Sequence, residues 1–158
     1  MKKKFLLPHQ TLFMRAPYLF PEKRFFIFTA GYGSGKTSSV ATSVVYDMMM
    51  LKDRKDREGR RPRLGLGGKS LGHLVKTTLS YILSDLENSK TPYKYNSKDS
   101  VLSVGNADLY MVSLARPGDI VGYDVCGFYG DELDDLGSVS MASASDMTFE
   151  AVKAVNER

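Results

Sequence analysis

Cysteine, long apolar runs and spaced metal ligands are what this sequence lacks. Its 158 residues include a single cysteine, Cys126, so no disulfide can form within the chain, and a lone thiol suits a reducing compartment. No apolar run is long enough to cross a membrane, and the apolar stretch before Pro8 is too short for a signal peptide. His9 and His73 have no neighbours at metal-ligand spacing. These features argue against disulfide-stabilised, membrane-spanning and histidine-metal proteins.

The overall composition is that of an ordinary soluble domain. Hydrophobic residues make up 42% and charged residues 25% of the chain, and 158 residues suffice for one domain with a buried core. The formal net charge is +4, which favours polyanionic partners only weakly and is equally compatible with an unspecialised basic surface. Function must therefore be sought in the motifs.

The most informative stretch is FFIFTAGYGSGKT, residues 25–37. Phe25–Phe28 is predicted to be a short buried strand, because it is apolar and rich in residues that favour strands. Three glycines make residues 29–35 a tight loop, since glycine adopts backbone angles that other residues resist. A helix then runs from Lys36 to about Met50, with apolar residues at helical spacing that should face the sheet.

A strand, a glycine loop and a helix that starts with Lys-Thr are together typical of phosphate binding. Loop N–H groups and the helix N-terminus attract the anion, Lys36 neutralises the β- and γ-phosphate oxygens, and the hydroxyl of Thr37 reaches Mg²⁺. The strict motif has glycine where this chain has Ala30, and a glycine turn that happens to precede Lys-Thr is the alternative. The predicted nucleotide-binding residues of this stretch are Gly31, Tyr32, Gly33, Ser34, Gly35, Lys36, Thr37 and Ser38.

A second site is predicted at Asp131 and Glu132, which end an apolar strand over residues 125–130 with Cys126 as a structural cysteine inside it. An acid at the end of a buried strand beside a phosphate loop can hold Mg²⁺, so Asp131 is a candidate metal ligand together with Thr37. Glu132 can orient and deprotonate an attacking water, a role that separates ATPases from kinases, whose acceptor is a substrate hydroxyl. Asp-Glu after an apolar run also occurs by chance. The presence of the glycine loop in the same chain makes the functional interpretation stronger.

The remaining chain is predicted to alternate between helices and strands. Three prolines argue against a long helix in residues 1–24. In that segment Gln10 precedes the glycine loop as a glutamine does in many P-loop motors, where its amide, which can donate and accept, contacts adenine; the alternative is an exposed polar residue. The other predicted elements are a strand over 63–67, a helix Leu71–Glu87 capped by Ser70, a polar loop over 90–99, a hairpin joining 101–104 to 108–114 through Gly105-Asn106, and a final helix starting at Ser145 or Asp146.

Residues 52–63, KDRKDREGRRPR, form a charged loop with seven basic and three acidic residues. One interpretation is a solvated connector. The other is a mobile basic loop that touches a nucleic-acid backbone, where lysine and arginine attract phosphates without reading sequence.

Three stretches resemble the ATPase part of the large subunit of tailed-bacteriophage terminases, the motors that package DNA into a procapsid. They are AGYGSGKT at 30–37, GKSLGHLVKTTL at 68–79 and ARPGDIVGYDVCGFYGDELDDL at 115–136. The last is the most distinctive, and FEAVKAVNER at 149–158 follows it. The resemblance covers most of residues 8–158, although helicases and other ATPases share the individual motifs.

The resemblance implies hydrolysis of ATP with Mg²⁺ as the second cofactor. Lys36 would bind phosphate, and Thr37 and Asp131 would bind Mg²⁺. Glu132 would be the catalytic base, and Gln10 would contact adenine.

Two further roles are less direct. Tyr32 stands where many terminases place a basic sensor of the γ-phosphate, so that role is moved or absent here. A neighbouring subunit usually supplies an arginine finger; Arg116 is the candidate, and a plain surface arginine is the alternative.

The implied partners are double-stranded DNA, the portal protein, the small terminase subunit and further copies in a homo-oligomeric ring, a pentamer. The protein would be virus-encoded and not secreted, working in the host cytoplasm away from membranes.

The expected fold is therefore a P-loop α/β three-layer sandwich, with a mostly parallel central sheet in additional-strand order and an antiparallel hairpin. Residues 1–24 would form an adenine-side segment and residues 25–158 the ATPase core. The coupling motif and nuclease domain of terminases are not visible by residue 158, so we expect an N-terminal piece without nuclease activity, or else a stand-alone small ATPase. The alternatives are a helicase-like nucleic-acid-dependent ATPase, a small-molecule P-loop kinase and a nucleotide-binding fragment without turnover.

Overall fold

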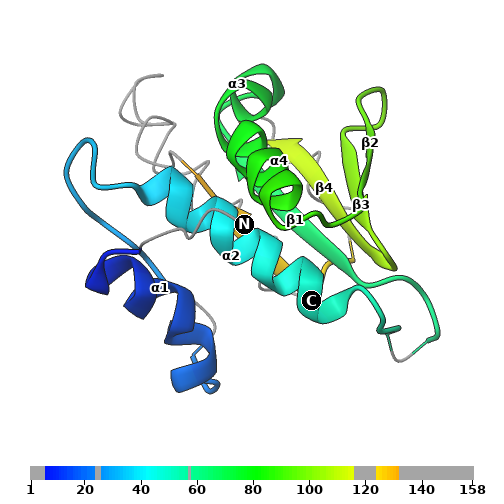
Figure 1. Ribbon diagram of the computed structural model, residues 1–158, viewed down its shortest axis with the longest axis horizontal. Helices are drawn as coiled ribbons and strands as arrows, with labels where there is room; N and C mark the ends of the chain where they lie inside the picture. Colours follow the sequence, from blue (N-terminus) through cyan, green and yellow to red (C-terminus); the bar gives the residue numbers. More distant parts are fainter. Residues whose placement is uncertain (1–5, 24–25, 57, 116–123, 132–158) are drawn as a thin grey trace.

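The computed structural model describes residues 6–23, 26–56, 58–115 and 124–131, and these residues form one sheet with helices packed against it (Figure 1). The elements are α1 (Pro8–Leu19), α2 (Lys36–Leu51), β1 (Arg63–Gly68), α3 (Leu71–Lys76), α4 (Thr78–Asn88), β2 (Lys94–Asn96), β3 (Val101–Val104), β4 (Ala107–Ser113) and β5 (Gly127–Gly130). None of the helices in this described part is long and apolar enough to cross a membrane.

The sheet is mixed, with strand order β2-β3-β4-β1-β5. β1 lies between β4 and β5 and runs parallel to both, whereas β2, β3 and β4 pair antiparallel. Gly105, with φ +55°, makes the turn between β3 and β4, as the sequence predicted. The α/β class, the parallel centre and the antiparallel hairpin are thus confirmed. The predicted additional-strand order includes one more strand, the one expected before the glycine loop, which is considered below.

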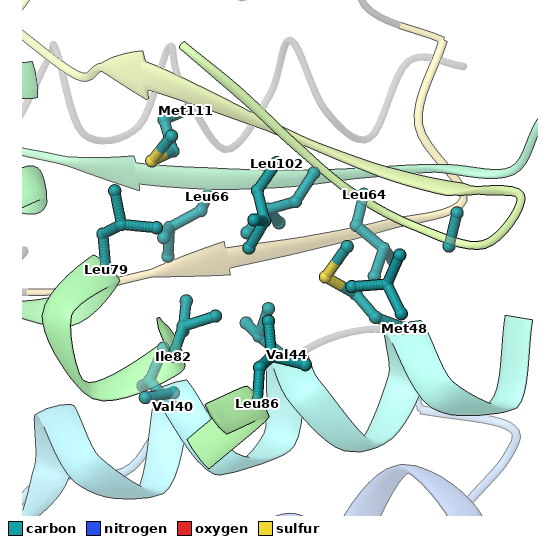
Figure 2. Packing of buried hydrophobic residues seen from close by; sticks show 14 of the residues in the cluster. Val40, Val44, Met48, Leu64, Leu66, Leu79, Ile82, Leu86, Leu102 and Met111 are labelled. Carbon is teal, nitrogen blue, oxygen red and sulfur yellow. The ribbon is translucent and has the colours of Figure 1, made fainter. Parts of the chain in front are cut away.

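The core lies between the sheet and two helices, α2 and α4, which cover one of its faces (Figure 2). Alternate residues of β1, β3 and β4 point toward this layer, as the period of a strand requires. The buried apolar side chains include Val40, Val44 and Met48 of α2, Leu79, Ile82 and Leu86 of α4, and Leu64, Leu66, Leu102, Leu109 and Met111 of the sheet. The described residues thus supply two layers of the predicted three-layer sandwich.

Glycines in β1 make room for an aromatic ring on the opposite face of the sheet. A Cβ added at Gly65 would lie 2.4 Å from the ring of Phe128, and one at Gly67 would lie 2.7 Å from it. Phe128 pairs with Gly65 across the β1–β5 register, so its ring lies over the glycines of the neighbouring strand. The unusual glycine content of β1 therefore fits the close approach of β5.

The predicted strand before the glycine loop is wrong for the residues that the structure describes. Residues 26–30 have no strand pairing, and Ile27 is 85% exposed. Phe28 instead packs its ring 5.2 Å from that of Phe13 and 5.7 Å from that of His9, both in α1. Contacts with α1 outweighed strand propensity, which depends on a neighbouring strand to pair with.

The N-terminal segment contains a helix of 12 residues, although its three prolines argued against a long one. α1 spans 12 residues and begins with Pro8, where a missing N–H costs nothing because the first N–H groups of a helix have no partner in it. Pro17 lies inside α1, and the helix ends two residues later at Leu19. The helix forms because of where its prolines lie, at its first position and near its end, whereas the prediction considered only how many prolines the segment contains.

Three smaller predictions also need correction. The predicted helix Leu71–Glu87 is divided into α3 and α4 at Thr77, whose φ of −105° and ψ of −90° are not helical. The predicted N-cap of this helix, Ser70, is confirmed, because its hydroxyl accepts a hydrogen bond from the N–H of His73 at 3.2 Å. The polar loop over 90–99 contains the short strand β2. Cys126 is exposed and precedes β5 rather than lying buried within it, and its thiol donates to the carbonyl of Arg63 at 3.1 Å.

A carboxylate on α2 joins that helix to α1 and to β5. Asp47 accepts hydrogen bonds from the phenols of Tyr18 in α1 and Tyr129 in β5. Burial raises the pKa of both phenols well above the ordinary value, and the carboxylate of Asp47 raises it further. Both tyrosines therefore stay protonated, and remain donors, throughout the neutral pH range.

Gly65→Ala should destabilise the fold by about 1 to 3 kcal/mol, because its methyl group would overlap the ring of Phe128. Gly72→Ala is the matched control: no atom lies within 4 Å of the added Cβ, and alanine favours the helix, so the free energy of unfolding should stay level or rise by up to about 1 kcal/mol. Urea unfolding of both variants measures the difference. Equal losses in the two variants would contradict the proposed packing.

Asp108→Asn should remove part of the acid sensitivity of the fold. Burial raises the pKa of Asp108, but hydrogen bonds from Arg61, at 2.7 Å, and Ser103, at 2.6 Å, outweigh burial and hold that pKa below its ordinary value. The ion pair therefore stabilises the fold above about pH 4, the value of an unfolded aspartate, and this stabilisation is lost as pH falls below it.

Urea unfolding at pH 7 and pH 3 tests this prediction. Asp108→Asn should lose about 1 to 3 kcal/mol at pH 7, since Arg61 is half exposed and solvent screens the pair, and should lose much less at pH 3. Asp53→Asn, at an exposed position, is the control and should change little at either pH. The same loss for Asp108→Asn at both values would show that the pair contributes nothing pH-dependent.

Candidate functional site

The glycine loop leads into the N-terminus of α2, a helix of 16 residues. Gly35 caps the helix in the left-handed conformation, with φ +79°, and Gly33 also has a positive φ of +75°. Within the described residues no side chain caps this end, and the first turn of α2 contains no acidic residue. A helix N-terminus carries partial positive charge, so this end of α2 is electrostatically suited to an anion.

Lys36 places a full positive charge at the same position. Its ammonium folds back over the loop and donates to the carbonyl of Ala30 at 2.6 Å and to that of Gly31 at 3.1 Å. These contacts hold the ammonium against the loop without neutralising it, because both partners are uncharged carbonyls.

Thr37, the next residue, meets the end of β5. Its hydroxyl donates to Oδ1 of Asp131 at 3.3 Å, across 94 positions of sequence. Asp131 is only 6% exposed, and its N–H extends the β1–β5 ladder by donating to the carbonyl of Gly67 at 3.0 Å. The structure thus brings together the two residues that the sequence predicted as metal ligands.

A residue that the sequence analysis missed completes this contact. Thr78, fully buried at the start of α4, donates its hydroxyl to Oδ2 of Asp131 at 2.6 Å. The sequence placed Thr78 on the buried apolar face of the helix predicted over Leu71–Glu87, and its burial is confirmed, but the pattern gave no sign of a role at the site. Its position at the site depends on the break at Thr77.

Gln10 is buried against the outside of the glycine loop. Its amide nitrogen donates to the carbonyls of Ser34 and Gly35, each at 3.3 Å, while its Oε1 accepts from the N–H of Leu7 at 2.8 Å. A Cβ added at Gly35 would lie 2.2 Å from that amide nitrogen. Gln10 therefore braces the loop from α1, and its contact with adenine stays a prediction.

The other predicted residues divide into those at the loop and those outside the described part. Tyr32 is fully exposed at the loop. The hydroxyl oxygen of Ser34 is buried and has no hydrogen-bond partner among the described residues, and the carbonyl of Ser38 accepts from Thr42 at 2.8 Å. Glu132 and Arg116 lie outside the described residues, as does the predicted final helix.

The charged loop between α2 and β1 has two of its arginines engaged with carboxylates. Arg60 pairs with Asp56 at 2.8 Å, with Glu58 at 3.0 Å and with Asp124 at 2.6 Å. Arg61 pairs with Asp108. Any attraction of this loop for nucleic acid therefore has to come mainly from its other basic residues.

The donor set of Thr37 and Asp131 fits Mg²⁺. Magnesium prefers oxygen ligands and is usually held by one or two protein groups together with substrate phosphates and water. A hydroxyl and a carboxylate 3.3 Å apart, beside a lysine and a helix N-terminus, supply that protein share.

The chain has a P-loop fold. Its features are an α/β sheet, a glycine loop at the N-terminus of α2, and the carboxylate of Asp131 at the end of β5. Among solved structures, the chain is similar to the large terminase of a thermophilic bacteriophage, with a TM-score of 0.69, 16% identity, and coverage of 94% of this chain and 36% of that one. No protein-family model and no curated protein matches the chain.

The chain is also similar to two structures of the same terminase with a bound nucleotide. The complex with ADP matches with a TM-score of 0.65 and covers 91% of this chain and 35% of that one, and the complex with ATP-γ-S matches with a TM-score of 0.64 over 91% and 34%, both at 16% identity. The predicted resemblance to large terminases is therefore confirmed at the level of the fold. The chain spans about a third of the length of these proteins.

Gln10→Ala tests whether this side chain braces the loop or reads the base. Because the amide nitrogen contacts loop carbonyls, we expect the affinities for ATP and GTP to fall by the same factor, together with a loss of stability of about 1 to 3 kcal/mol. Fluorescence titration with the two nucleotides measures the ratio. A loss confined to ATP would instead support the predicted contact with adenine.

Proposed function

We propose that this chain is the ATPase module of a terminase-like DNA-packaging motor, which hydrolyses Mg²⁺-ATP to drive double-stranded DNA into a procapsid. The observation that carries the proposal is the contact between Thr37, at the start of the phosphate-loop helix, and Asp131, at the end of β5. The fold of the chain is similar to that of a terminase solved with ADP and with ATP-γ-S, and this similarity supports the same proposal.

The residues at the loop would bind and orient the triphosphate. Lys36 would exchange its contacts with the carbonyls of Ala30 and Gly31 for the β- and γ-phosphate oxygens, which are stronger partners because they are charged. The N-terminus of α2 and the backbone of residues 31–37 would stabilise the remaining negative charge. Gln10 would keep the loop in shape from behind.

Mg²⁺ would be held by Thr37 and Asp131, and when bound it would neutralise charge that develops on the phosphate oxygens. Glu132, the next residue along the chain, would orient a water for attack on the γ-phosphate and accept its proton. An arginine from a neighbouring subunit in the ring would complete the charge stabilisation, and Arg116 is the candidate. Water as the acceptor separates this proposal from a small-molecule kinase.

The proposed partners follow from the motor. Double-stranded DNA, the portal protein and the small terminase subunit would contact surfaces outside the nucleotide site, and further copies of the chain in a pentameric ring would supply the arginine that reaches it. The chain would act in the host cytoplasm. A helicase-like ATPase has the same catalytic residues and differs only in what the motion is used for.

Phosphate release from Mg²⁺-ATP, with and without double-stranded DNA, tests the proposal. Glu132→Gln should abolish turnover while ATP still binds, because the variant loses the base but keeps the phosphate contacts. Lys36→Ala should weaken ATP binding by about 10-fold or more, as expected for a lost charge-assisted contact. Lys55→Ala, in the exposed loop beyond the other end of α2, is the control and should bind ATP as the wild type does.

Each alternative predicts a different result. Turnover that Glu132→Gln leaves unchanged would contradict the assignment of the base, and phosphate transfer that requires an added acceptor would identify a kinase. Stimulation by single strands rather than duplex would favour the helicase-like enzyme. Tight ATP binding without any phosphate release would mean that the chain needs its ring neighbours or further sequence to turn over.

A further inference from the structure

We infer that Thr78 is a positioning residue for the Mg²⁺ site, holding one oxygen of Asp131 so that the other faces Thr37. The inference rests on the proposed function, since it concerns the same site. It gives a role to a buried hydroxyl that the phosphate-loop motif does not include.

The two oxygens of Asp131 are held unequally. Oδ2 accepts from Thr78 at 2.6 Å, and Oδ1 accepts from Thr37 at the longer distance of 3.3 Å. The stronger contact therefore fixes the carboxylate from the side of α4. The more weakly held oxygen is the one directed at the candidate metal ligand on α2, where it is available to a cation.

The Thr78 hydroxyl reaches a carboxylate on another element, as the Thr42 hydroxyl does, but its partner is the strand-end residue at the candidate metal site. Threonine in a helix commonly bonds back to the carbonyl four residues earlier. Thr77 does so, to His73 at 2.9 Å, and Thr42 lies within reach of both Ser38, at 2.8 Å, and Asp85 of α4, at 3.0 Å. Thr78 follows the non-helical Thr77 and begins α4, and its hydroxyl reaches across to the strand end instead.

Burial makes this contact consequential. Thr78 is 0% exposed and Asp131 is 6% exposed, so water is poorly placed to replace the hydroxyl if it is removed. A carboxylate that loses its outer partner becomes free to rotate, and loss of such supporting hydrogen bonds commonly lowers metal affinity by about 10- to 100-fold. Phosphate contacts made by Lys36 and the loop do not depend on this hydroxyl.

Thr78→Val removes the hydroxyl while keeping the shape, and Thr78→Ser keeps a donor. The matched control is Thr42→Val, because Thr42 also joins α2 to α4 through a hydroxyl–carboxylate bond, to Asp85 at 3.0 Å, outside the site. The probes are ATP in EDTA, ATP with Mg²⁺, and Mn²⁺ followed by electron paramagnetic resonance in the presence of ATP.

We expect Thr78→Val to weaken Mn²⁺ binding by about 10-fold or more and to remove most of the gain in ATP affinity that Mg²⁺ gives, with ATP binding in EDTA unchanged. Thr78→Ser should stay within about 3-fold of the wild type. Thr42→Val should lose stability without changing the response to metal. If Thr78→Val fails to fold, Thr78→Ala takes its place with the same expectation.

Three results would overturn the inference. Metal-dependent binding in the wild type that Thr78→Val or Thr78→Ala retains would overturn the role of Thr78 alone. So would a loss in Thr42→Val equal to that in Thr78→Val, because it would reflect general helix packing. A wild type that binds ATP without any response to metal would overturn the proposed function, and this inference with it.

Discussion

The carboxylate of Asp131 is the point at which three separate parts of the chain meet. It follows directly after β5, and hydroxyls from the starts of α2 and α4 donate to its two oxygens. A nearly buried charge of this kind is costly unless hydrogen bonds satisfy it. The fold therefore has to bring both helix starts to the end of β5, and the glycine loop that precedes α2 comes with them. The geometry of the candidate site follows from satisfying this one group.

Close strand packing is what allows that meeting. β5 approaches β1 because Gly65 and Gly67 leave space for the ring of Phe128, and the N–H of Asp131 then continues the ladder to Gly67. On the other face, Tyr129 of β5 reaches Asp47 of α2. The same short strand is thus fixed on one face by an aromatic ring over glycines and on the other by a phenol–carboxylate bond. Both contacts limit how far its carboxylate can move.

Local signals predicted much of this arrangement, and long-range contacts explain the rest. α2, β1 and the hairpin follow from periodicity and turn glycines, which act over short stretches. The pairing of Thr37 with Asp131, 94 positions apart, was expected from the two motifs that contain them. The strand expected at 25–28 was wrong for its described residues because Phe28 packs on α1, a contact that no local pattern reports. The break at Thr77 was missed because Leu71–Glu87 has a continuous apolar face. The role of Gln10 as a brace depends on loop carbonyls 24 and 25 positions away.

Hydrogen bonds from two tyrosines and a glutamine connect the elements around the site. α1 braces the loop through Gln10 and joins α2 through Tyr18, while Asp47 carries the connection on to β5. Burial and Asp47 raise the pKa of both tyrosines, so neither phenol loses its proton near neutrality. The ion pair of Arg61 and Asp108 weakens only in acid, because the pKa of Asp108 is held low. The hydrogen bonds between these elements therefore persist through the neutral range.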